Sequence, residues 1–75
     1  MEAKVLYISK SGKSASIAVV TKLGKINTSI SGFVGINEGE TLEVGDVLPL
    51  DGVKKVIVDI RMSEEGEAFN FLRFE

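Results

Sequence analysis

Eight glycines divide this 75-residue chain so finely that few stretches could hold a helix of ordinary length. A glycine inside a helix costs about 1 kcal/mol relative to alanine, so this spacing disfavours helices along most of the chain. Between the glycines, apolar residues alternate with polar ones, which is the period of a half-buried strand. Residues 37–52 hold three glycines and the proline, which indicates a loop with short extended pieces. We therefore expect an all-β, helix-less protein.

The alternation predicts five main strands, over residues 2–10, 15–22, 25–36, 53–62 and 67–75. In the first strand, Val5 and Tyr7 fall on one face, and Leu6 and Ile8 fall on the other. The fourth segment fits both a helical stripe and a strand face. Its four β-branched residues between positions 56 and 60 favour the strand.

The third predicted strand separates an apolar face from a polar face. The apolar face holds Ile26, Ile30, Val34 and Ile36. Phe33 falls on the polar face, among serines and an asparagine. Gly32 and Gly35 predict bulges that would bend a small sheet into a barrel, and such bulges would turn Phe33 into the core. Both positions of Phe33 remain open at this point.

The last predicted strand carries aromatic residues on both faces. One face holds Phe69, Phe71 and Arg73, and the other holds Asn70, Leu72 and Phe74. Either Phe69 and Phe71 form core while Leu72 and Phe74 cover a dimer interface, or the reverse holds.

Five antiparallel strands in one domain of residues 1–75 cannot cover both faces of an open sheet. We therefore expect a small five-stranded antiparallel barrel. Two hairpins, one long connection and a final hairpin favour an OB-fold-like barrel, with an SH3-like barrel as the alternative. A core of this size supplies little stability, so we also expect a homodimer.

The chain contains no cysteine and no histidine. This excludes thiolate and imidazole metal ligands, thiol nucleophiles and the serine–histidine pair. The glycine-containing segments lack the spacing of a phosphate-binding loop, and the paired carboxylates fall in turns, where solvated charges are more common than a cation site. We expect no catalytic activity, cofactor, metal site or small-molecule substrate.

The net charge of −2 hides an uneven distribution. Residues 1–35 hold five lysines and one glutamate, a net +4, whereas residues 36–75 carry a net −6. Lys10 and Lys13 flank the first predicted turn, and Lys22 and Lys25 flank the second. In an OB-like barrel these turns lie beside the surface that binds oligonucleotides.

A single-stranded nucleic-acid site needs cations for the phosphates and flat side chains for the bases. Tyr7, Phe33 and Phe71 are the predicted stacking residues, and Arg73 follows Phe71 on the same face. The predicted nucleic-acid-binding set is Lys10, Lys13, Lys22, Lys25, Tyr7, Phe33, Phe71 and Arg73.

The Ser-Gly-Lys-Ser turn at residues 11–14 and the closing strand at residues 66–74 resemble those of the small single-stranded DNA-binding proteins of bacteriophages. The resemblance implies an OB-type barrel that dimerises and coats single-stranded DNA without sequence preference. We therefore expect a non-catalytic protein that binds single-stranded DNA, and the choice between DNA and RNA stays open at this point. The alternative is a structural or protein-interaction barrel, such as a virion or assembly component, whose lysines only solubilise it.

The N-terminal segment enters apolar alternation without a basic stretch followed by an apolar run. We therefore expect a cytoplasmic protein, located in the host cytoplasm if it is viral, with no membrane partner.

Overall fold

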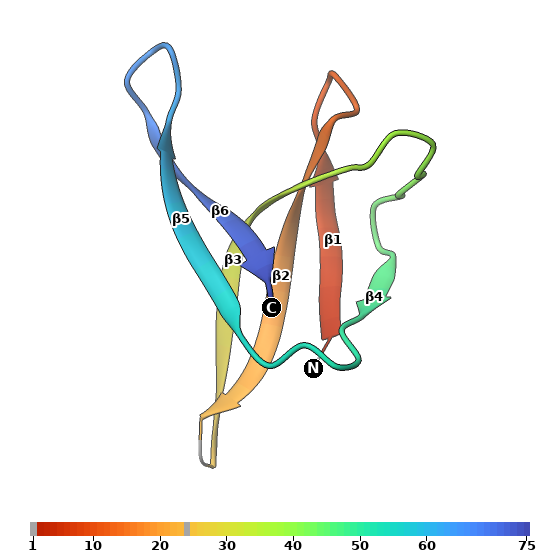
Figure 1. Cartoon of the computed structure of the whole chain (residues 1–75), viewed down its shortest axis with the longest axis vertical. Coiled ribbons are helices and arrows are strands. Elements are labelled where there is room, and N and C mark those ends of the chain that lie inside the picture. Colours follow the sequence, from red (N-terminus) through yellow and green to blue (C-terminus); the bar gives the residue numbers. More distant parts are fainter. Residues whose placement is uncertain (1, 24) are drawn as a thin grey trace.

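The computed structural model describes residues 2–23 and 25–75, and this part of the chain forms six strands and no helix (Figure 1). The strands are β1 (Glu2–Ile8), β2 (Ser14–Leu23), β3 (Ile26–Gly35), β4 (Val47–Pro49), β5 (Val56–Met62) and β6 (Ala68–Phe74). They form one sheet in the order β4-β1-β2-β3-β6-β5. Neighbours run antiparallel except β3 and β6, which are parallel. Across these residues, therefore, no helix is available to cross a membrane.

The all-β prediction is confirmed, but the prediction of a closed five-stranded barrel is wrong. The sheet is open, and its two edges are β4 and β5. Closing the five long strands would require β5 to pair with β1. The long connection contributes β4 instead, which pairs with Glu2, Ala3 and Lys4 and occupies that edge of β1.

The buried core lies on one face of β1 and β2, which we call the core face. The fully buried side chains are Ala3, Val5, Ala15, Ile17, Val19 and Leu72. Leu42, Leu48 and Leu50 of the long connection and Phe74 of β6 pack against them. The connection and the β5–β6 hairpin thus cover the face that barrel closure would otherwise have enclosed.

The only register shift between β1 and its neighbour β2 is a bulge between Val5 and Tyr7. The bulge leaves Leu6 as the extra residue, and Tyr7 faces Ser16 while Ile8 faces Ala15. Tyr7 therefore lies opposite the core face, on what we call the outer face. The prediction that Val5 and Tyr7 share a face is wrong, because the bulge shifts the alternation by one residue.

No bulge occurs at Gly32 or Gly35, where the sequence predicted bending of the third strand. Strands β2 and β3 pair without interruption from Ser14↔Gly35 to Leu23↔Ile26. This regular register keeps Phe33 on the outer face, opposite Ser16.

Gly32 is the point where β6 approaches β3. A Cβ atom there would lie 2.9 Å from Leu72 Cγ and 3.1 Å from the Asn70 carbonyl oxygen. Leu72 is 2% exposed, and it is the one fully buried side chain that the β5–β6 hairpin contributes within the described residues. The core face of β6 is therefore the Leu72 and Phe74 face, which excludes the alternative in which Phe69 and Phe71 form the core.

We expect Gly32→Ala to lower the free energy of unfolding by about 1–3 kcal/mol, because the added methyl group must displace Leu72 or the β6 backbone. Urea denaturation measures this change. Gly35→Ala is the matched control on the same strand, since its Cβ would meet only Phe71 Cζ at 3.9 Å. Equal stability of the two variants would contradict the close-approach explanation.

Candidate nucleic-acid interface

Three aromatic residues lie in one row across the outer face. Tyr7 faces Ser16, Ser16 faces Phe33, and Phe33 faces Phe71 in the parallel contact between β3 and β6. Residues that face one another in a sheet project from the same side. Tyr7 is 52% exposed, and Phe33 and Phe71 are half-buried. The structure therefore brings together the three residues that the sequence proposed for base stacking.

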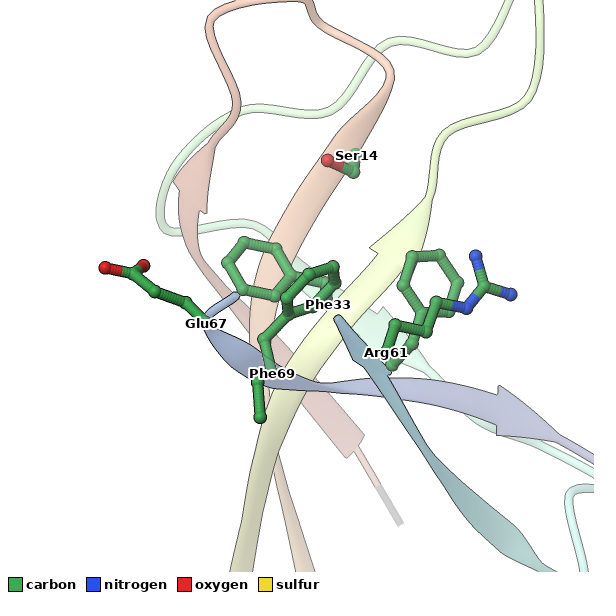
Figure 2. A pocket seen from close by; sticks show the side chains of 7 residues that line it. Ser14, Phe33, Arg61, Glu67 and Phe69 are labelled. Carbon is green, nitrogen blue, oxygen red and sulfur yellow. The ribbon is translucent and has the colours of Figure 1, made fainter. Parts of the chain in front are cut away.

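Phe33 and Phe71 line an open groove of about 360 Å³ on the outer face. Its lining residues are Ser14, Phe33, Arg61, Glu67, Ala68, Phe69 and Phe71. Phe33 and Phe69 meet edge to face, with ring centroids 5.6 Å apart and planes at 82° (Figure 2). The Arg61 guanidinium carbon lies 3.9 Å from the centroid of the Phe71 ring.

The groove combines apolar rings with one cation. Arg61 makes no salt bridge within residues 2–23 and 25–75, and its guanidinium lies over the face of the Phe71 ring. Figure 2 shows the Glu67 carboxylate pointing away from Phe33 and Phe69. An arrangement of this kind can accept a flat aromatic group and an adjacent anion.

The β1–β2 turn carries Lys10 and Lys13 at the same end of the sheet as the groove. Within the turn, the Ser14 amide donates to Ser9 Oγ at 3.2 Å. The Ile36 amide donates to the Lys13 carbonyl at 2.8 Å and fixes the turn against the end of β3. Both lysines are exposed, and Ser14, which ends the turn, lines the groove.

Lys13 also has acidic residues near it. It borders a second hollow that is lined by Glu38 and Glu40 of the long connection. The electrostatic attraction of an anion to this end of the sheet therefore depends mainly on Lys10 and Arg61. The cations predicted from the sequence at this turn were Lys10 and Lys13.

The structure does not bring Lys25 to the groove. Lys25 is exposed in the β2–β3 turn, at the far end of two ten-residue strands, about 30 Å along the sheet. The backbone of Lys22 pairs with Asn27, but its side chain lies outside the described part of the structure. Figure 1 shows the β2–β3 turn at the opposite end from the β1–β2 turn.

Arg73 lies on the outer face but is engaged by carboxylates. Its Nε donates to Asp59 Oδ2 at 2.7 Å, and its Nη1 lies 3.7 Å from Glu75 Oε1. The hydrogen bond and the charge of Asp59 raise the pKa of Arg73 above its ordinary value. Its cation is thus already partnered, unlike that of Arg61.

Arg61 is the groove residue that the sequence analysis missed. It occupies the polar register of β5, between the apolar Ile60 and Met62. The hairpin register places it opposite Phe69 and diagonal to Phe71. The apolar–polar alternation of β5 predicts the face on which Arg61 lies. It does not predict the contact of Arg61 with Phe71, because that contact depends on the hairpin register that the turn at residues 63–67 sets.

We expect a double-mutant cycle of Phe33→Leu and Phe69→Leu to give a coupling energy of about 0.5–1.5 kcal/mol in the free energy of unfolding, because the two rings interact directly across β3 and β6. Denaturant unfolding of the four proteins measures it. Strictly additive effects would show that the two rings do not stabilise this contact.

The carboxylates within the described residues form no group of three or more that could hold a metal ion. What the site offers is a set of binding contacts, namely aromatic faces and one guanidinium, with Lys10 and Lys13 in the turn at the same end of the sheet. Comparison with models of protein families, with curated proteins and with solved structures finds no match to this chain.

Proposed function

We propose that this protein binds single-stranded nucleic acid, DNA in the first instance, on the outer face and without sequence preference. The observation that carries the proposal is the row of Tyr7, Phe33 and Phe71 in register, with Arg61 over the last ring. Each base stacked on an aromatic side chain contributes about 1–3 kcal/mol, whatever the base. A row of rings from neighbouring strands therefore supports affinity without sequence readout.

The distribution of acidic residues also supports the proposal, despite the net charge of −2. Of the eleven acidic residues, only Glu2 and Asp59 lie in strands. Asp59 is paired with Arg73. The negative charge is therefore concentrated in loops and turns, which leaves the central outer face able to accept phosphates near Arg61 and Lys10.

An OB-related fold is part of this proposal. OB-folds bind oligonucleotides on the face of their second and third strands and at the loop between the first and second. The groove here adjoins the outer face of β2 and β3 and the β1–β2 turn. An open sheet leaves this face as available as a closed barrel would.

Binding can be followed without a label, because Tyr7 is the only tyrosine and the chain has no tryptophan. We expect oligo-dT at low salt to quench the Tyr7 fluorescence as bases stack on the ring, and the affinity to fall steeply as salt is added. Oligo-rU tests RNA in the same way. Unchanged fluorescence, together with unchanged anisotropy of a labelled oligonucleotide at tens of micromolar protein, would overturn the proposal.

Variants locate the site. We expect Phe71→Leu to weaken the binding of a labelled oligo-dT by about 1–3 kcal/mol, because leucine retains the apolar volume but removes the flat face. Arg61→Gln should weaken binding and reduce the salt dependence, because a phosphate partner is lost.

A matched pair of lysine variants distinguishes the groove from general attraction to cations. Lys10→Gln and Lys25→Gln change the charge equally, but only Lys10 lies at the groove end of the sheet. With a short oligonucleotide, Lys10→Gln should weaken binding more than Lys25→Gln does. Equal losses would indicate attraction to charge anywhere on the surface.

A structural or protein-interaction role is the second candidate, and the unpaired edge of β5 favours it. Assembly of the chain beyond a dimer, with no response to nucleic acid, would support that role in place of the first.

A further inference from the structure

Strand β5 forms a long sheet edge that nothing in the described chain covers. It contains seven residues, and its only strand neighbour is β6 (Figure 1). The register with β6 runs without a shift, and β5 contains no proline, glycine or lysine that would discourage strand addition. The opposite edge, β4, has only three residues and includes Pro49. Of the two edges, β5 is the one suited to pairing.

The hydrogen bonds at both ends of the hairpin show which backbone groups of β5 are unpaired. Lys55 and Glu75 exchange reciprocal backbone bonds of 3.0 Å, and the Ser63 amide donates to the Glu67 carbonyl at 2.8 Å. In an antiparallel ladder, hydrogen-bonded pairs alternate with non-hydrogen-bonded pairs. Because Lys55 and Ser63 are in hydrogen-bonded pairs, the odd-numbered residues of β5 point their amides and carbonyls toward β6. The amides and carbonyls of Val58, Ile60 and Met62 therefore point outward.

The same three residues expose their side chains. Ile60 is 73% exposed, Met62 is 65% exposed and Val58 is 43% exposed. Their side chains project on the core side of the sheet, since Val58 lies opposite the buried Leu72 of β6. The edge thus presents an apolar stripe beside a row of unpaired backbone groups.

We propose that two copies of this chain pair antiparallel along β5, with Ile60 on the two-fold axis. Only the even-numbered residues of β5 have backbone groups that point outward. A second copy can therefore pair only in registers that place its even-numbered residues opposite even-numbered residues. With Ile60 opposite its own copy, Val58 faces Met62 in both directions, and Asp59 of each copy faces Arg61 of the other. Moving the axis one step either way places Asp59 against Asp59 or Arg61 against Arg61.

The charges therefore select this register, because like charges directly opposite in a sheet are destabilising. Asp59 and Arg61 occupy non-hydrogen-bonded pairs, where side chains approach most closely. The strand is complementary to itself under a two-fold rotation, which is why the occupant is a second copy and not an unrelated strand. This inference rests on the edge of the sheet, and it stands whether or not the outer face binds nucleic acid.

Sedimentation of the full chain tests the pairing. We expect a dimer at micromolar concentration, and Ile60→Lys should raise its dissociation constant about tenfold or more by placing a charge in the apolar stripe. Ile26→Lys is the control, since Ile26 is 69% exposed but lies at the far end of β3. A monomeric wild-type chain at hundreds of micromolar, or a dimer that Ile60→Lys leaves intact, would overturn the proposal.

Complementary charge variants test the register. Arg61→Glu alone places two acidic side chains in each close pair, and Asp59→Lys alone places two basic ones there, so each protein should sediment as a monomer. An equimolar mixture restores an opposite-charge pair at both positions and should form a heterodimer. If the wild type dimerises but the mixture stays monomeric, the proposed register is wrong.

Discussion

The contact of Leu72 with Gly32 joins the two halves of this protein. The β1–β3 meander and the β5–β6 hairpin meet where β6 runs parallel to β3, with a single registered pair between Phe33 and Phe71. On the core face, Leu72 occupies the space that a side chain at Gly32 would fill. On the outer face, the same approach brings Phe33 against Phe69. The core and the candidate binding groove are therefore opposite sides of one crossing, and a change that separates the strands would affect both.

Much of this architecture follows from residue alternation. All five predicted main strands exist, and the apolar and polar faces of β3 are as the pattern predicted. The choice of strand over helix is also confirmed for Val56–Met62, where β-branched residues outweighed the helical stripe, whereas residues 53–55 lie outside β5. Alternation is informative here because β1 and β2 each bury one face and leave the other more exposed.

The features that the sequence did not reveal depend on contacts distant along the chain. The bulge at Leu6 carries no glycine and leaves no mark in composition, yet it decides the direction of Tyr7. Strand β4 is too short to show an alternation of apolar and polar residues. It nevertheless occupies the edge of β1 with which β5 would pair in a closed barrel. Arg61 reaches Phe71 only through the register of a hairpin whose turn lies several residues away. A pattern within one strand cannot report which strand will lie beside it.

The short strand β4 has a consequence for assembly. Proline cannot donate a backbone hydrogen bond, and three residues offer little for another chain to pair with. A sheet that can be extended from only one of its two edges joins one partner and then has no competent edge left. Growth into a fibril requires both edges, so β4 would limit the pairing proposed along β5 to a finite, closed complex.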